Sequence, residues 1–315
     1  MSPPSSDPIV TVVIPVYRDY SSLRECLHAL ENQSLGTDQF DVIVVDNGTP
    51  IEEFQDPRSF GMSLNLRIVR ESQGGSYAAR NAGINRANTE AFAFTDADCR
   101  PHQQWLETGV DAVRATDVGL VAGRVEVVQE SSGSPNVVEI QRLRSAFTQK
   151  EYVAEEGFGA TANLFTTRSV FDVVGAFRHE LRSGGDKEWG RRVQSAGLKL
   201  RYAEDAVVRH RARATISELF EKTVRTAIGS YQVSRIEEAE RRQALNAVKA
   251  RKSSNEFFSD AVNGAKALFC DPKLSLRQKI GVASVSGIQQ VTFLATQCVM
   301  AIRDSLNLSQ GPSAG

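Results

Sequence analysis

Two aspartates, Asp96 and Asp98, stand one residue apart directly after the apolar segment Ala91–Thr95. The segment predicts a buried β-strand, so both carboxylates would lie at a strand-to-loop turn and could approach one divalent cation. Mg²⁺ and Mn²⁺ prefer such hard oxygen ligands, and phosphate oxygens can complete their coordination. An Asx-type turn that merely ends the strand explains the same spacing, so other residues must decide between the two interpretations.

The elements that would position these aspartates form a regular alternation. Apolar, β-branched segments predict strands at Ile9–Val16, Val42–Val45, Leu66–Val69, Ala91–Thr95, Val121–Val128, Ala162–Thr166 and Leu200–Tyr202. Helical patterns lie between them, at Leu23–Leu30, Tyr77–Ala87, Gln103–Val113, Val170–Val174 and Glu188–Ser195. This alternation predicts an α/β fold with a mostly parallel central sheet flanked by helices. Such sheets bind ligands at the carboxyl ends of their strands, where Asp46 and Asp96 would meet.

Composition limits the class of protein. The chain has 315 residues, of which 41% are hydrophobic and 24% charged, and this suits one large domain with an appendage. The formal net charge of -1 gives no global basic field, so nucleic acid is not expected as a partner. The four cysteines form no CxxC pair, which argues against structural zinc and disulfides and favours the cytoplasm. Residues 1–8 lack a signal-peptide pattern and predict a flexible tail.

Five further segments accompany the aspartate pair in a fixed order along the chain. They are Val13–Tyr17, Val45–Thr49, Gly74–Gly83, Gly184–Trp189 and Val207–His210. Their order and spacing resemble the family 2 glycosyltransferases of the GT-A fold, over roughly Val10–Arg213. The resemblance implies a metal-dependent, inverting enzyme that moves a sugar from a nucleotide diphosphate sugar to an acceptor hydroxyl. It implies Mn²⁺ or Mg²⁺ as the cofactor.

The resemblance also implies a nucleotide site made of Pro15, Tyr17, Asp46, Arg80 and Asp96. Tyr17 offers a stacking face, and Asp46 offers a carboxylate that can accept a ring N–H. Arg80 follows a Gly-Gly loop at the start of a helix and can reach a base or a phosphate. Asp96 is expected on ribose or sugar hydroxyls.

The metal and the general base are implied in the same way. Asp98 occupies the family's metal-ligand position, and His210 matches a late histidine that can add a ligand or touch the diphosphate. The family's base is the second member of an acidic pair that opens a helix; here the pair reads Gly185-Asp186, without its first acid. A carboxylate at a helix N-terminus is held ionised, as a base must be, so Asp186 is the expected base and Glu188 its substitute.

The sugar and acceptor contacts are expected from Asn163, Gly185, Glu188 and Trp189. UDP is the expected nucleotide because it is the commonest in similar enzymes. The acceptor is left open among a glycan, a lipid-linked sugar and a small molecule, with a role in glycan or polysaccharide biosynthesis. Processive synthases of the family carry Gln-x-x-Arg-Trp, whereas Gln141–Arg144 has no following Trp, so one sugar per encounter is expected.

Two other functions fit parts of the pattern. A nucleotidyltransferase also uses strand-end carboxylates and a metal, but it normally needs a Gly-rich phosphate loop after the first strand, and Pro15–Arg18 has no glycine. A non-catalytic sugar-nucleotide-binding protein is compatible with the missing acid before Asp186. Three retained aspartates favour the enzyme over this second alternative.

The C-terminal third predicts helices only. We expect a glycosyltransferase domain over residues 9–225 and a helical extension over 226–315. The segment Ile280–Ile302 has no charged residue. It fits a packed helix pair, a helix on a membrane surface or a partner such as a second copy, or a true membrane span. The second interpretation places the enzyme peripherally at the inner face of the membrane.

Overall fold

The computed structural model describes residues 7–129, 133–144, 147–245, 268, 271 and 273–309. The chain divides into two compact units, the first made of residues 1–128 and 146–211 and the second of residues 129–145 and 212–315. Most of the predicted tail, residues 1–6, lies outside the described residues, as does Cys270. The expected domain boundary after residue 225 falls inside a helix of the second unit.

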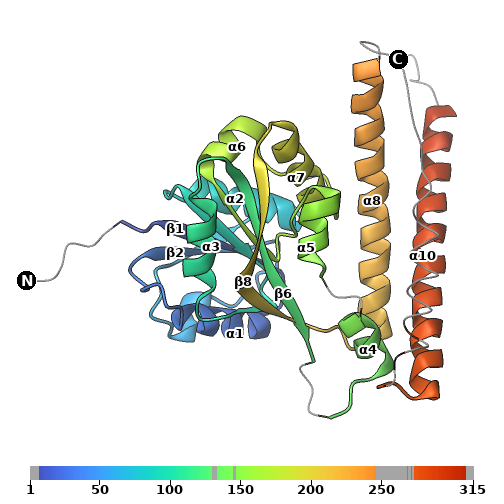
Figure 1. Ribbon diagram of the computed structural model, residues 1–315, viewed down its shortest axis with the longest axis horizontal. Helices are drawn as coiled ribbons and strands as arrows, with labels where there is room; N and C mark the ends of the chain where they lie inside the picture. The colour runs from blue at the N-terminus through green and yellow to red at the C-terminus, as the bar shows by residue number, and fades with distance from the viewer. Residues whose placement is uncertain are drawn as a thin grey trace, which may run out of the picture. The chain divides into compact units, whose positions relative to one another are not determined.

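One mixed sheet forms the centre of the first unit (Figure 1). Its strands are β1 (Val10–Val16), β2 (Phe40–Asp46), β3 (Leu66–Arg70), β4 (Ala91–Thr95), β5 (Cys99–Pro101), β6 (Val118–Val128), β7 (Asn163–Thr167) and β8 (Lys199–Arg211). In the described residues the strand order is β3-β2-β1-β4-β7-β6-β8-β5. Strands β1 to β4 pair in parallel, as do β6 and β8, whereas β7 and β5 run antiparallel to their neighbours. The predicted α/β fold with a mostly parallel sheet is confirmed.

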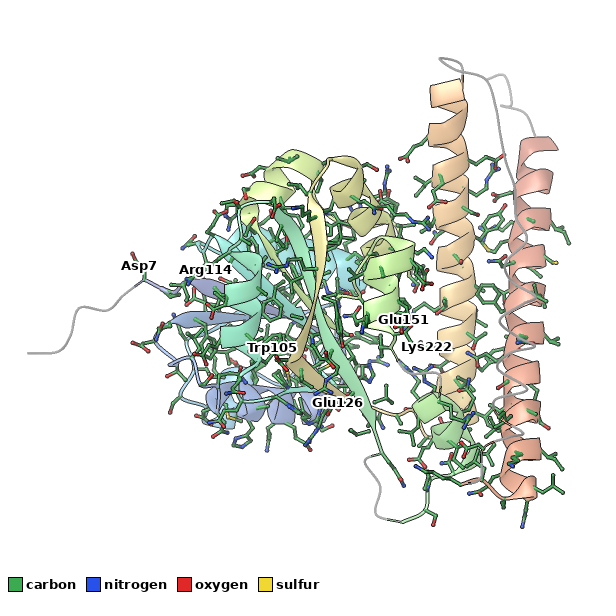
Figure 2. All side chains as sticks on the ribbon, viewed as in Figure 1. Asp7, Trp105, Arg114, Glu126, Glu151 and Lys222 are labelled. Atoms are coloured by element: carbon green, nitrogen blue, oxygen red, sulfur yellow. The ribbon has the colours of Figure 1, made fainter. Side chains whose placement is uncertain are left out.

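Helices cover both faces of this sheet. The longer ones are α1 (Tyr20–Glu31), α2 (Ser76–Arg86), α3 (Trp105–Val113), α6 (Arg168–Val174) and α7 (Gly185–Ser195). Shorter turns are η1 (Pro57–Phe60), α5 (Gln149–Glu151) and η2 (Tyr152–Glu156). Asp19 caps α1 by accepting a hydrogen bond from the Ser22 amide at 3.2 Å. Side chains of α1 and α3 share one core with β1, β2 and β4, and this core includes the fully buried Trp105, labelled in Figure 2.

The alternation of β1 explains why its sequence is apolar except at Thr11, whose hydroxyl is bonded to that of Thr89. Val12 and Ile14 point into the core that contains α1 and α3. Val13 points to the opposite face, where α2 crosses at Gly83: a Cβ there would lie 2.4 Å from Val13 Cγ1. A strand buried on both faces carries apolar residues at every position, and the glycine permits the close approach of the helix.

The second unit is helical, as the loss of strand patterns after Thr215 predicts. It contains α4 (Val137–Arg144), α8 (Ile216–Leu245) and α10 (Leu276–Ser309). Helices α8 and α10 lie side by side (Figure 1), and the Tyr231 hydroxyl on α8 donates to Asp304 Oδ2 on α10 at 2.8 Å. On α4, Gln141 donates to the Gln289 amide oxygen on α10 at 3.0 Å. The segment Ile280–Ile302 lies within α10, which contacts both α8 and α4.

Candidate active site

The carboxyl end of β2 places Asp46 between two neighbouring strands. Its register partners are Val16 on β1 and Arg70 on β3. The carboxylate is fully buried: the Tyr20 hydroxyl donates to Oδ1 at 2.8 Å, and Arg70 Nε donates to Oδ2 at 3.1 Å. Both carboxylate oxygens of Asp46 are thus engaged by the protein, so Asp46 stabilises this edge of the sheet.

Beside it, the turn after β1 presents an aromatic ring to solvent. Tyr17 is 54% exposed, so it is no core aromatic. The turn requires an unusual backbone, with Arg18 at φ +61° and its amide donating to Thr49 Oγ1 at 3.1 Å. Pro15, on β1 just before the turn, is the register partner of Val45 on β2. An exposed ring on a fixed turn is suited to stacking on a nucleotide base.

The glycine-rich loop before α2 is held by a side chain from β2's end. The Asn47 amide donates to the Gln73 carbonyl at 2.7 Å and accepts from the Gly75 N–H at 2.7 Å. Gly75 has φ +124°, which favours glycine, and it caps the N-terminus of α2. Asn47 therefore fixes the approach of the chain to the helix that carries Arg80.

Arg80 links this helix to the aspartate pair. It is 2% exposed, and its Nη2 donates to Asp96 Oδ1 in an ion pair. Its Nε is buried without a hydrogen-bond partner among the described residues. Buried donors are ordinarily satisfied, so an orphaned guanidinium N–H beside a carboxylate suits a ligand that brings an acceptor oxygen, such as a phosphate or a hydroxyl.

Asp186 lies in the first turn of α7 and is half-buried. Its Oδ1 accepts from the Tyr77 hydroxyl at 3.1 Å and from the Lys187 amide at 3.0 Å, and its Oδ2 accepts from the Thr161 amide at 3.4 Å. Burial raises the pKa of this carboxyl, while the Arg80 charge and these hydrogen bonds lower it, and the balance leaves the pKa raised. A raised pKa brings a carboxylate nearer to the range in which a general base works best.

Asp98 and His210 come together because β5 pairs with β8, which sets Cys99 opposite His210. His210 Nε2 lies 3.6 Å from Asp98 Oδ2, and His210 Nδ1 lies 2.8 Å from the Arg211 carbonyl. A carbonyl can only accept, so Nδ1 carries the hydrogen, and in the neutral ring Nε2 offers its lone pair toward Asp98. Metal-binding histidines are typically oriented in this way.

Cys99 completes a group whose ligand atoms, with those of Asp98 and His210, all lie within 4.8 Å of one another. Burial raises the pKa of the Cys99 thiol well above its usual range, so the sulfur stays protonated. It donates to the Ala162 carbonyl at 3.8 Å. The carboxylate and the imidazole are therefore the ligands of this group that suit Mn²⁺ or Mg²⁺.

The segment before β7 ties the aspartates together. The Thr161 amide contacts Asp186, and the next carbonyl, that of Ala162, accepts from the Thr95 hydroxyl at 3.1 Å. Thr95 is the last residue of β4 and precedes Asp96. The backbone of two adjacent residues, Thr161 and Ala162, thus joins Asp186 to the end of β4 and brings the predicted base near the predicted aspartate pair.

Asn163 has a different role from the predicted one. It is fully buried, and its amide accepts from Trp105 Nε1 at 2.8 Å and donates to the carbonyls of Arg124 at 2.9 Å and Ala206 at 2.8 Å. These bonds use the whole amide to join α3, β6, β7 and β8. The expectation that Asn163 contacts a sugar hydroxyl does not fit, because the group is occupied inside the protein.

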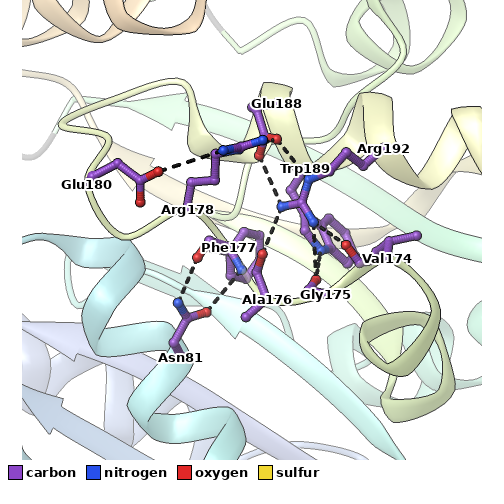
Figure 3. A network of polar contacts seen from close by, with 10 residues as sticks. All are labelled: Asn81, Val174, Gly175, Ala176, Phe177, Arg178, Glu180, Glu188, Trp189 and Arg192. Carbon is purple, nitrogen blue, oxygen red and sulfur yellow. Dashed lines mark hydrogen bonds and ion pairs between the residues drawn. The ribbon is translucent and has the colours of Figure 1, made fainter. Parts of the chain in front are cut away.

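Glu188 and Trp189 are likewise structural in this arrangement. Figure 3 shows the Glu188 carboxylate between two guanidinium groups, with Arg178 Nε and Arg192 Nε each donating to Oε1 at 2.8 Å. Trp189 is fully buried, and its indole N–H donates to the Gly175 carbonyl at 2.9 Å. Neither side chain faces a substrate, so the expected substitute base and sugar-stacking ring do not fit their surroundings.

The same network reaches α2. The Asn81 amide donates to the Phe177 carbonyl at 2.8 Å and accepts from the Phe177 N–H at 3.1 Å (Figure 3). Asn81 and Glu188 therefore hold two adjacent residues, Phe177 and Arg178, of the loop that leads from α6 into α7. Because α7 begins at Gly185, this loop sets the position of Asp186.

We expect Glu188→Gln to lower the free energy of unfolding by about 1–3 kcal/mol, because two guanidinium groups lose their charged partner. Urea titration followed by circular dichroism measures the change. Glu180→Gln is the matched control, since Glu180 is exposed and lies 3.9 Å from the same Arg178. Equal stability of the two variants would contradict the structural role of Glu188.

The predicted site omits two residues that touch Asp186. Tyr77 lies in the glycine-rich segment that the sequence singles out, but nothing in its type distinguishes a core aromatic from a hydrogen-bond donor. Thr161 acts through its backbone amide, which every residue except proline has. The packing of α2 on the start of α7 identifies the Tyr77 contact, and the position of the segment before β7 identifies the Thr161 contact.

Comparisons with known proteins agree with this arrangement. Residues 11–175 match the family described as "Glycosyl transferase family 2". Glycosyltransferase AglE of Haloferax volcanii is 38% identical over 231 residues, which cover 73% of this chain and 75% of the relative. Pre-mycofactocin glycosyltransferase of Mycobacterium tuberculosis is 30% identical over 218 residues, and the match spans 66% of this chain and 44% of that longer relative.

Solved structures share the fold. A mannosyltransferase from Pyrobaculum calidifontis, PcManGT in complex with GDP-Man and Mn²⁺, aligns with a TM-score of 0.55 at 18% identity, over 97% of this chain and 82% of that one. S. aureus TarS 1-349 in complex with UDP-GlcNAc aligns with a TM-score of 0.52 at 17% identity, over 70% of this chain and 66% of that one. At such identities the likeness concerns the fold.

Proposed function

The chain belongs to glycosyltransferase family 2 and has its GT-A fold, and from this premise we propose that it is a metal-dependent, inverting, non-processive enzyme acting on a UDP-linked sugar. The observation that carries the proposal is the position of Asp186. Its carboxylate is held by Tyr77 and by the Thr161 amide, across Arg80 from Asp96. In this arrangement Asp186 is the base on one side of the Arg80 guanidinium group, which would bind phosphate. Asp96, whose carboxylate would bind hydroxyl groups, lies on the other side.

The donor is proposed to bind along the carboxyl ends of β1, β2 and β4. The exposed Tyr17 ring stacks on the base, while the orphaned Nε of Arg80 donates to a phosphate oxygen. Asp96, whose side chain is one-third exposed, accepts from ribose or sugar hydroxyls. Asp46 supports the site indirectly, because its carboxylate holds Arg70 and Tyr20 in place. Pro15 fixes the turn that presents Tyr17.

Asp98 and His210 would hold the divalent cation, because they offer one carboxylate oxygen and one imidazole nitrogen toward the same point. A bound Mn²⁺ or Mg²⁺ neutralises negative charge on the diphosphate as it leaves. The Arg211 carbonyl keeps the His210 ring in the tautomer that such binding needs.

The proposed reaction is a single displacement. The acceptor oxygen forms a bond to the anomeric carbon as the bond from that carbon to the β-phosphate oxygen breaks, and the nucleoside diphosphate leaves with the electron pair. Asp186 takes the proton of the acceptor hydroxyl, so atoms and charges balance. Because attack and departure occur on opposite faces, the anomeric configuration inverts.

A direct test is incubation of the protein with UDP-, GDP- and dTDP-sugars and Mn²⁺ in the presence of glycan, lipid-linked and small-molecule acceptors. Release of a nucleoside diphosphate with an inverted product, followed by NMR, supports the proposal. Release of pyrophosphate instead would indicate a nucleotidyltransferase. A rise in melting temperature with a nucleotide sugar, without any release, would indicate a binding protein.

We also propose that the enzyme works in the cytoplasm at the inner face of a membrane, which would suit a lipid-linked acceptor in glycan synthesis. Helix α10 is long and apolar enough to cross a membrane by length and composition alone. One stripe along it stays exposed, made of Leu276, Ile280, Ile288, Val291, Leu294, Val299 and Ile302. Lys273, Arg277 and Lys279 stand at its N-terminal end and would favour anionic lipid.

We expect Val291→Glu with Leu294→Glu to abolish flotation of the protein with vesicles that contain anionic lipid, because two charges would enter the acyl boundary. Sugar transfer to a soluble acceptor should stay within about twofold of the wild type. Gln290→Glu is the matched control, since Gln290 is exposed next to Val291 in the sequence but is not part of this stripe. A wild-type protein that never floats but elutes as a dimer would assign the stripe to a second copy.

A further inference from the structure

We propose that Tyr77 is the positioning residue for Asp186 and that its ring and hydroxyl take the place of the acid that is missing at position 185. This inference rests on the proposed function, in which Asp186 is the base. The resemblance described above implies an acidic pair at the start of this helix, whereas here the first member is Gly185. The structure supplies a reason for that difference.

The ring of Tyr77 fills the space that a side chain at position 185 would need. A Cβ on Gly185 would lie 2.7 Å from Tyr77 Cε2, 2.8 Å from Cδ2 and 2.9 Å from Cζ, which is closer than packed carbons approach. Tyr77 is 5% exposed, and its ring lies 5.8 Å from that of Phe177, so it has little room to move aside. A tyrosine here and an acid at 185 therefore exclude each other in this arrangement.

The hydroxyl of Tyr77 orients the Asp186 carboxylate through a hydrogen bond from a neutral donor. Burial raises the pKa of Tyr77, so the phenol stays protonated and donates its O–H to Asp186 Oδ1. The Lys187 amide donates to the same oxygen, which leaves Oδ2 with only the 3.4 Å bond from Thr161 among the described residues. Oδ2 is thus the oxygen with capacity to receive the acceptor proton.

Other groups around Asp186 cannot substitute for this donor. Arg80, on the same helix as Tyr77, lowers the pKa of Asp186 through its charge but is paired with Asp96. Lys187 directs its ammonium group to Glu156. Tyr152 lies near enough to sense the Asp186 charge, yet its hydroxyl bonds to Thr148. The Tyr77 hydrogen bond opposes the effect of burial on the pKa of Asp186, so removal of the hydroxyl should raise that pKa further.

The test is the pH profile of kcat/KM for Tyr77→Phe. A base works when it is deprotonated, so the rate rises with pH through its pKa; loss of a donor to the carboxylate raises that pKa and moves the acid limb to higher pH. We expect a loss on the order of tenfold on the acid limb and recovery to within about twofold on the alkaline plateau, with the donor KM unchanged. Tyr152→Phe, the control, should leave the limb in place.

A second pair of variants tests the steric exclusion. Gly185→Glu should reduce transfer in the wild-type background and reduce it less in a Tyr77→Ala background, where the ring is absent; such coupling between neighbours is what a double-mutant cycle measures. Melting temperatures and donor binding identify variants that fail to fold. An unchanged acid limb in Tyr77→Phe, or additive effects in the cycle, would overturn the inference. Wild-type turnover in Asp186→Asn would instead refute the proposed base.

Discussion

Asp186→Asn is expected to lower kcat for sugar transfer by about 10²–10⁴-fold, because an amide cannot take the acceptor proton. The substitution keeps the shape of the side chain, and its oxygen can still accept from the Tyr77 hydroxyl and the Lys187 amide. The start of α7 should therefore keep its position. Nucleotide binding, which is proposed to involve Tyr17, Arg80 and Asp96, should change by about twofold or less.

Measurement of kcat at saturating donor, together with calorimetric binding of the nucleoside diphosphate and Mn²⁺, separates the two effects. Asp172→Asn is the matched control, since Asp172 is exposed on α6 and lies outside the site. Glu188 offers no alternative base, because two guanidinium groups hold its carboxylate. Turnover within about threefold of the wild type in Asp186→Asn would remove the base assignment.

The fold could be predicted largely because both faces of the sheet are buried. The central parallel strands β1, β2 and β4 read as mostly apolar segments, and Asp46 and Asp96 come at or just after strand ends. Because the carboxyl ends of parallel strands share one edge of a sheet, the sequence alone predicts that Asp46 and Asp96 lie on the same side. Gly83, which weakens the helix prediction, is explained by the close approach of α2 to Val13.

The partners that each polar side chain contacts could not be predicted in the same way. Asn163, Glu188 and Trp189 have the right types for sugar contacts, and they lie within a few residues of the site. Their burial is decided by the packing of α3 on Asn163, by the ion pairs of Arg178 and Arg192 with Glu188, and by an aromatic cluster around Phe177. A residue type states which hydrogen bonds are available, whereas tertiary packing decides which partner takes them.

The proposed metal ligands show the opposite case, because the structure brings together two residues that the resemblance paired. Asp98 and His210 are more than a hundred residues apart in the sequence, and the antiparallel pairing of β5 with β8 brings them together. The sequence pattern predicts only the short strand Leu200–Tyr202 within β8 and no strand at β5. The Nδ1–H bond to the Arg211 carbonyl, which sets the tautomer, is visible only in the structure.

Removal of divalent cations with EDTA is expected to abolish transfer, and Mn²⁺ is expected to restore it. His210→Gln and Asp98→Asn should each weaken Mn²⁺ binding in the presence of the nucleoside diphosphate and lower kcat/KM on the order of a hundredfold, because charge on the leaving diphosphate is no longer neutralised. Electron paramagnetic resonance of Mn²⁺ measures the binding directly, without reference to activity.

His102→Gln is the matched control for this prediction, since His102 lies 3.7 Å from Glu126 and outside the Asp98–His210 pair. Excess Mn²⁺ should partly rescue His210→Gln, because a weakened site is filled by mass action, but it should not rescue Asp186→Asn, whose defect is in proton transfer. This difference in rescue separates the two halves of the proposed mechanism. Full activity of the wild type in EDTA would assign the Asp98–His210 contact to an ordinary ion pair and leave charge on the diphosphate to Arg80.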